Sequence, residues 1–112
     1  MNTSSFKKAV DNPNAVSIAR SYPYWFPMKR EYRMLAPPGD LLWAFKSGDI
    51  DEAIYMEKYH RMILDKMNAQ KVYAELGENA VLCCWEAAGR FCHRRIVADW
   101  LKEKLGVEVP EL

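Results

Sequence analysis

Residues 80–95 constrain the fold most, because they combine an apolar run, a short polar loop and the start of a helix. Residues 80–84 are apolar and β-prone, Glu86 lies in the loop, and residues 92–95 read Cys-His-Arg-Arg. A helix that begins just after a strand presents unpaired backbone N–H groups and the positive end of its dipole. Such helix starts bind anions. We therefore predict that the functional site lies where this strand passes into this helix.

Length and composition indicate one folded domain. The chain has 112 residues, of which 50% are hydrophobic and 28% are charged. These values are typical of a folded domain with a modest core. The formal net charge of +1 provides no strong basic field for duplex nucleic acid. We predict a single domain over residues 1–112 and no duplex nucleic-acid partner.

The cysteines and the N-terminal segment suggest a cytoplasmic protein. Residues 1–8 lack the apolar segment of a secretory signal, and the apolar runs are too short to span a bilayer. The chain has three cysteines, and on a strand Cys83 and Cys84 would point to opposite faces. We expect reduced thiols, a cytoplasmic location and no membrane partner.

Short apolar segments alternate with helical segments along the chain. Strands are predicted at residues 14–20 and 81–84, with an edge strand at 107–109. The Pro- and aromatic-rich residues 22–27 are predicted to form an ordered loop over the sheet edge. Helices are predicted for residues 39–46, for a longer segment after residue 49, and for residues 69–76 and 91–105.

The longer helix has a capping-box pattern, in which Asp49 is followed three residues later by Glu52. Strands separated by helices pair in parallel through right-handed crossovers. The predicted fold class is therefore α/β, with a short, mostly parallel sheet flanked by helices.

In open α/β sheets, ligands bind beyond the carboxyl ends of the strands. Arg20 ends the first predicted strand, and Glu86 closely follows the strand at 81–84. If these strands are parallel neighbours, both residues face one crevice together with residues 92–94.

Several segments of the chain resemble the uncharacterised domain of unknown function 488 (DUF488) family of bacteria and bacteriophages. They are Val-Ser-Ile-Ala-Arg at 16–20, Leu-Ala-Pro at 35–37, the tyrosines at 55 and 59, and Leu-Cys-Cys-Trp-Glu at 82–86 followed by Cys-His-Arg at 92–94. The resemblance covers most of the chain. It implies a fold and a site but no established reaction, and the chain residues at the family's recurrent polar positions are Arg20, Glu86, Cys92, His93 and Arg94.

The chain departs from the longer family members in two respects. We find no initial strand with a glycine-rich turn before residues 14–20, and Trp85 and Arg90 make the motif loop more aromatic and more basic.

Each candidate residue also has a structural interpretation. Cys92 is a nucleophile if the helix dipole and its neighbours lower its pKa, or a small buried residue. His93 is a general acid or base, or a group that holds the loop through a backbone carbonyl. Arg94 binds an oxyanion in bidentate fashion, or forms an internal salt bridge with Glu86.

Two more specialised sites fit the pattern less well. Cys84 and Arg90 have the spacing of a tyrosine-phosphatase loop, but Glu86 would place negative charge beside the phosphate. Cys84, Cys92 and His93, with Glu86, are ligand types that zinc accepts. However, the chain has no C-x2-C pair, and adjacent helical residues diverge by about 100°. We therefore predict no metal and no cofactor.

Three functions remain open. We favour binding of a small anionic or nucleotide-like ligand at the strand-to-helix pocket, with or without catalysis. Arg20 and Arg94 would bind its anionic group, and Tyr22 and Trp25 its ring, while Cys92, His93 and Glu86 are the catalytic candidates. The first alternative is a non-catalytic phage or bacterial interaction protein that blocks or sequesters a partner through exposed aromatics. Its partner would be another protein or a second copy of the chain. The second is a cysteine-dependent hydrolase or transferase.

Overall fold

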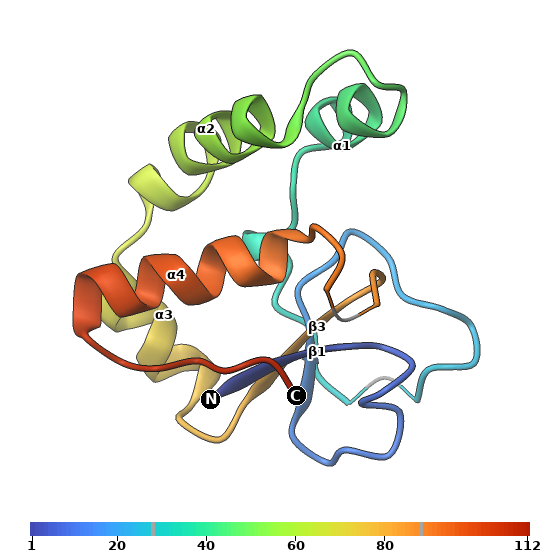
Figure 1. Cartoon of the computed structure of the whole chain (residues 1–112). Helices are drawn as coiled ribbons and strands as arrows, with labels where there is room; N and C mark the ends of the chain where they lie inside the picture. The colour runs from blue at the N-terminus through green and yellow to red at the C-terminus, as the bar shows by residue number, and fades with distance from the viewer. Residues whose placement is uncertain (28, 88) are drawn as a thin grey trace.

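A computed structural model describes residues 1–27, 29–87 and 89–112 and confirms the α/β prediction (Figure 1). Three strands form one parallel sheet: β1 (Asn2–Ser5), β2 (Ala15–Ser17) and β3 (Val81–Cys84). Their order is β1-β3-β2, so β3 is the central strand and pairs in parallel with both others. The carboxyl ends of β2 and β3 therefore lie at the same edge.

The sequence did not predict the first strand, β1, so the structure corrects the prediction at residues 2–5. The residues of this strand, Asn-Thr-Ser-Ser, are all polar and lack the apolar pattern of a buried strand, yet three of the four are buried. Pairing with β3 and with the C-terminal segment stabilises it, because the Thr3 amide donates to the Pro110 carbonyl at 3.0 Å. The structure has no strand at 107–109, another correction. The C-terminal segment instead meets β1 in an isolated bridge between Thr3 and Glu111.

In the described residues, four α-helices and two short 3-10 helices make up the helical part. The helices are α1 (Gly39–Lys46), α2 (Glu52–Met62), α3 (Ala69–Leu76) and α4 (His93–Leu105). The short 3-10 helices are η1 (Arg33–Leu35) and η2 (Leu64–Lys66). None of the helices in the described part of the chain is long and apolar enough to cross a membrane.

Two helix starts differ from the prediction. The side chain of Asp51, not of Asp49, caps α2 by accepting from the Ile54 amide at 2.9 Å. A capping side chain must reach the third amide of its helix, and Asp49 lies two residues too early. Helix α4 begins at His93 rather than at residue 91, because Cys92 keeps an extended backbone as the N-cap.

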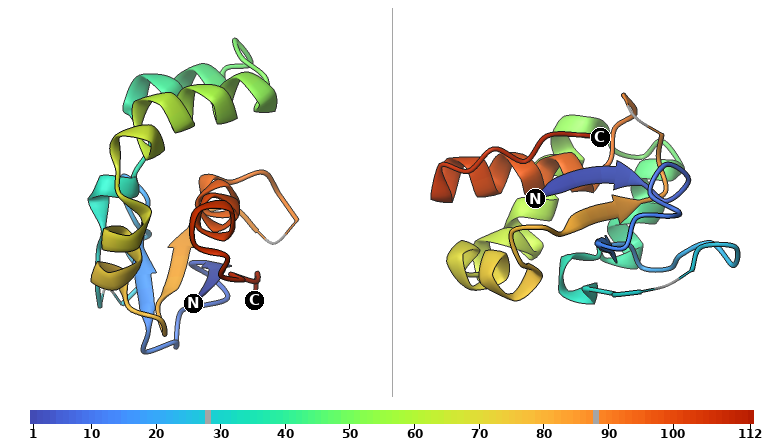
Figure 2. Two further views of the ribbon diagram at one scale, coloured as in Figure 1. Left: turned by 90° about the vertical axis from the view of Figure 1, so that its left-hand side faces the viewer. Right: turned by 90° about the horizontal axis from the view of Figure 1, so that it is seen from below.

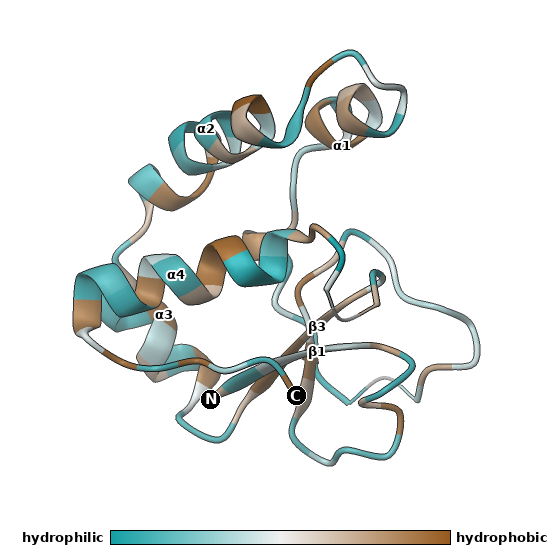
Figure 3. Ribbon diagram, in the orientation of Figure 1, coloured by the Kyte–Doolittle hydropathy of each residue, from teal (hydrophilic) through white to brown (hydrophobic). Residues whose placement is uncertain are grey.

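Apolar residues fill both faces of the sheet. On one face, Val16 and Leu82 pack with buried residues of α2, α3 and α4. The other face is covered by Phe6 and Phe26. Figure 3 shows α4 as alternating apolar and polar bands, as expected for a helix with one face in the core. Helices α1 and α2 lie side by side at one end of the molecule, the end toward which β3 points (Figure 2).

Candidate functional site

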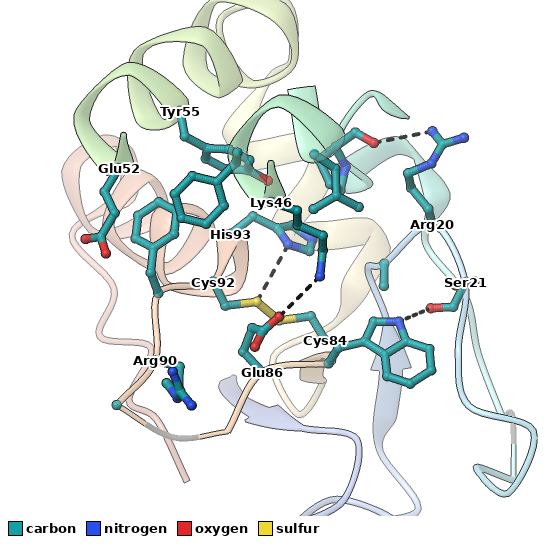
Figure 4. Close-up of a pocket in the computed structure, with 17 residues that line it drawn as sticks. Arg20, Ser21, Lys46, Glu52, Tyr55, Cys84, Glu86, Arg90, Cys92 and His93 are labelled. Carbon is teal, nitrogen blue, oxygen red and sulfur yellow. Dashed lines mark hydrogen bonds and ion pairs between the residues drawn. A yellow bond between two sulfur atoms is a disulfide. The ribbon is translucent and has the colours of Figure 1, made fainter. Parts of the chain in front are cut away.

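A cavity of about 410 Å³ lies between the carboxyl ends of β2 and β3, the start of α4, and helices α1 and α2 (Figure 4). This is the sheet edge at which open α/β folds bind ligands. The residues that line it are Ala19, Arg20, Ser21, Pro37, Leu42, Phe45, Lys46, Glu52, Tyr55, Cys84, Trp85, Glu86, Gly89, Arg90, Phe91, Cys92 and His93.

Four of the predicted site residues meet in this cavity. Arg20, Glu86, Cys92 and His93 all line it, and they do so because β2 and β3 are parallel neighbours, as predicted. Arg20 lies exposed at the rim, where its guanidinium donates to the Pro37 carbonyl at 3.4 Å. The sequence argument from strand ends thus located the crevice.

The charged groups of the cavity come from separate elements. The ammonium of Lys46, at the end of α1, lies 3.9 Å from the Glu86 carboxylate, and both side chains are partly exposed. Arg90 is exposed in the loop before α4, and Glu52 begins α2. With Arg20, three cations and two carboxylates line the cavity.

An aromatic wall, formed by Phe45, Tyr55 and Phe91, closes the side of the cavity next to α1 and α2. The ring centroids are 5.2 Å apart for Phe45 and Tyr55, 5.1 Å for Phe45 and Phe91, and 5.3 Å for Tyr55 and Phe91. Burial raises the pKa of Tyr55 well above its usual value. The sequence did not predict this wall. The signal that could have indicated it was the position of these three aromatic residues in segments predicted to be helical.

The structure does not bring Tyr22 and Trp25 to the cavity, which corrects the prediction that these two residues bind the ring of the ligand. Neither residue is among those that line it, and both are partly exposed, at 41% and 46%. The physical reason is the neighbouring Phe26, which is buried and packs against Phe6 with ring centroids 4.8 Å apart. This contact anchors the loop on the other face of the sheet.

His93 is buried and neutral. Its Nε2 lies 2.7 Å from the Ile18 carbonyl oxygen, and because a carbonyl only accepts, Nε2 carries the proton. Burial lowers the pKa of His93 to about 4. At neutral pH, Nδ1 therefore has a free lone pair, and it faces the Cys92 sulfur at 3.8 Å. The hydrogen bond to a backbone carbonyl is the one that the structural interpretation of His93 expects, whereas its role as a general acid or base stays a prediction.

The Cys84 and Cys92 sulfurs are joined in Figure 4, although their Cα atoms lie 7.3 Å apart, wider than the roughly 4.4–6.8 Å usual for a disulfide. The expectation that all three cysteines are reduced stays a prediction. Cys84 is the last residue of β3, and Cys92 is the residue just before α4. The two cysteines are eight residues apart in sequence and meet at the edge of the sheet. Cys83 is a buried free thiol, and burial raises its pKa to about 11.

The Cys84 and Cys92 sulfurs and a ring nitrogen of His93 lie within 4.8 Å of one another. The expected divergence of Cys92 and His93 was wrong, because Cys92 is extended rather than helical.

Arg94 lies behind the cavity rather than in it. Its side chain is 1% exposed and pairs with the Glu111 carboxylate. Its Nη1 donates to the Cys84 sulfur at 3.0 Å and to the Glu86 backbone carbonyl at 2.7 Å. The structure therefore corrects the prediction that Arg94 binds the ligand. It also corrects the expected salt bridge, because Arg94 pairs with the Glu111 carboxylate and not with that of Glu86. The buried guanidinium holds the motif loop and the Cys84 sulfur in place.

A family model matches most of the chain. The model described as the active DUF488-N3 subclade, DUF488-N3a, matches residues 6–105. The chain belongs to the DUF488 family. No curated protein and no solved structure matches it.

In this DUF488 chain, the five polar residues singled out by the resemblance form two layers. Arg20, Glu86, Cys92 and His93 line the cavity, whereas Arg94 supports it from within the core. Glu111, the partner of Arg94, was missed because it is 17 residues away in sequence and follows the last helix. The phosphatase-like spacing from Cys84 to Arg90 includes residue 88, which lies outside the described residues.

Proposed function

We propose that the cavity binds a small anionic molecule that also carries a ring, as a nucleotide does. One observation carries the proposal: Arg20, Lys46 and Arg90, from three separate elements, line the same cavity as the aromatic wall. Guanidinium and ammonium groups bind phosphate or carboxylate. Aromatic side chains bind a planar ring by stacking.

The start of α4 adds to the attraction for anions. No side chain of the described residues caps this 13-residue helix. Cys92 and His93 at its start line the cavity, so the positive end of its dipole adjoins the cavity. Glu52 and Glu86 also line the cavity. Carboxylates accept hydrogen bonds from hydroxyl or amino groups, which favours a ligand with such donors over an inorganic anion.

Catalysis on the bound molecule would use His93 and Glu86, together with Cys92 when its sulfur is reduced, and all three residues line the same cavity. Cys92 and His93 supply a sulfur and an unprotonated ring nitrogen 3.8 Å apart, and Glu86 supplies a carboxylate. The description of the matched subclade as active is in keeping with chemistry at this site.

A panel of nucleoside monophosphates, sugar phosphates and uncharged nucleosides, assayed by thermal shift and by NMR titration, tests the proposal. We expect a phosphorylated compound to bind more tightly than its uncharged counterpart. Lys46→Ala and Arg90→Ala should each weaken binding about tenfold, as for the loss of one charge-assisted hydrogen bond. Lys104→Ala is the matched control, because Lys104 lies at the opposite end of α4.

The proposal is contradicted if no compound in the panel binds. It is also contradicted if Lys104→Ala weakens binding as much as Arg90→Ala does, because the effect would then come from overall charge.

A further inference from the structure

Cys84, Cys92 and His93 form a cluster at the cavity, and ligand binding by the cations and the aromatic wall does not require it. All three are buried, and their ligand atoms lie within 4.8 Å of one another. All three also line the cavity. Two sulfurs and an imidazole nitrogen are the donors that zinc prefers.

We infer that, when its two thiols are reduced, this cluster binds one zinc-like divalent cation through the Cys84 sulfur, the Cys92 sulfur and His93 Nδ1. The fourth coordination position then faces the cavity, because all three ligands line it. A set of three protein ligands with an open fourth position is characteristic of catalytic zinc, whereas structural zinc has four.

The backbone geometry suits a metal. In a tetrahedral zinc site, two sulfurs lie about 3.8 Å apart, and a sulfur and a nitrogen about 3.6 Å apart. Cys92 Sγ and His93 Nδ1 are already 3.8 Å apart. The Cα atoms of Cys84 and Cys92 are 7.3 Å apart, wider than the roughly 4.4–6.8 Å usual for a disulfide. Once reduced, the two sulfurs therefore have room to separate around an ion.

The groups around the ligands are those that a metal site requires. His93 Nε2 donates to the Ile18 carbonyl at 2.7 Å, which orients the ring and leaves Nδ1 free to bind. Metal-ligating histidines usually make such a bond with their other nitrogen. Arg94 Nη1 donates to the Cys84 sulfur at 3.0 Å, which stabilises a thiolate. The Arg94 charge is itself balanced by Glu111.

Binding of the cation conserves charge and accounts for every proton. The cation displaces one proton from each of the two thiols, and both protons leave to solvent. Two thiolates then neutralise the two charges of the ion, and His93 contributes a lone pair without changing its protonation. The resulting buried centre carries no net charge, which reduces the cost of burying it.

Cobalt(II) is the probe of choice, because its absorption reports tetrahedral geometry and thiolate ligation. The whole chain, reduced with a phosphine and free of metal, is titrated with Co²⁺ and then with Zn²⁺. We expect one equivalent of Co²⁺ to produce thiolate charge-transfer and tetrahedral bands, which one equivalent of Zn²⁺ removes. Cys84→Ala and Cys92→Ala should weaken binding at least 100-fold, and His93→Gln at least tenfold. Cys83→Ala is the matched control and should bind like the native chain.

A second measurement on the native chain avoids the risk that a variant fails to fold. Zn²⁺ should slow the labelling of Cys84 and Cys92 by a maleimide at least tenfold, as mapped by mass spectrometry. The inference is overturned by an octahedral spectrum, by the absence of stoichiometric binding, or by equal losses in Cys83→Ala and Cys84→Ala. It is also overturned if Cys92 is labelled equally fast with and without Zn²⁺, which would favour a free thiol. The metal is tested alone and the ligand panel with a chelator, so either proposal can fail without the other.

Discussion

Arg94 and Glu111 form a bidentate ion pair between the start of the last helix and the C-terminal segment. Arg94 Nε donates to Glu111 Oε1 at 3.0 Å, and Nη2 donates to Oε2 at 2.6 Å. The arginine side chain is 1% exposed, whereas the glutamate is 23% exposed. Thr3 of β1 also donates to Glu111, at 2.6 Å. The pair therefore ties α4, the first strand and the C-terminal segment together beneath the cavity.

Replacing Glu111 by Gln should destabilise the fold by about 3 kcal/mol. The substitution leaves the buried Arg94 charge without its partner, and an uncompensated buried charge is costly. Glu108→Gln is the control, because Glu108 pairs with Lys102 where both side chains are more than half exposed. Its effect should stay within about 0.5 kcal/mol. Denaturant unfolding measures both variants, and equal effects would show that burial of the Arg94 pair is unimportant.

The stability contribution of Glu111 should depend on pH in the acid range. Burial alone would raise the pKa of Glu111, but hydrogen bonds from Arg94 and Thr3 outweigh it and hold the pKa below its usual value of 4.5. A carboxyl group with a lowered folded-state pKa stabilises the fold above its unfolded pKa. The difference in unfolding free energy between the native chain and Glu111→Gln should thus be constant above about pH 5.5. It should shrink as pH falls below 4.5, through the folded-state pKa. A difference that grows on acidification would contradict the assignment.

Ligand affinity should depend on the aromatic wall and not on the exposed aromatic loop. Phe45→Leu keeps an apolar side chain but removes a ring from the cavity, and should weaken binding of a ring-bearing ligand about three- to tenfold. Tyr22→Ala and Trp25→Ala should leave the affinity unchanged, since neither residue lines the cavity. Isothermal titration with the best ligand of the panel measures all three variants. The opposite ranking would place the ring site on the loop.

The Tyr59 hydroxyl should contribute to stability through one buried hydrogen bond. It donates to the Leu35 carbonyl at 2.5 Å, and Tyr59 is fully buried. Tyr59→Phe leaves that carbonyl without its donor and should cost about 1–2 kcal/mol. Tyr55→Phe is the matched control, because its ring stacks on that of Tyr59 while its hydroxyl bonds to none of the described residues. Thermal unfolding should therefore show the larger decrease for Tyr59→Phe.

Local patterns were sufficient for the helices and for the strands that bracket the site. Residues 69–76 were predicted as a helix with the bounds that α3 has, because Gly77 marks its end. The apolar run of β3 was also recognisable, since a central strand is buried on both faces. Cap choice was less accurate: two aspartates precede α2, and only the one whose oxygen reaches the Ile54 amide forms the cap.

The sequence by itself determined the α/β class, the sheet edge of the candidate site and four of the residues that line its cavity, because helical periodicity and the apolar runs of strands are local properties. Tertiary structure alone decided which polar segment became a strand: Asn2–Ser5 pairs with β3 for reasons that its composition does not contain. It also decided that Tyr22 and Trp25 lie away from the cavity, and that Arg94 is buried against Glu111. The proximity of Cys84, Cys92 and His93 depends on an extended Cys92 backbone and on where a strand end meets a helix start. Such relationships join residues far apart in the chain, so only the packing of the whole domain specifies them.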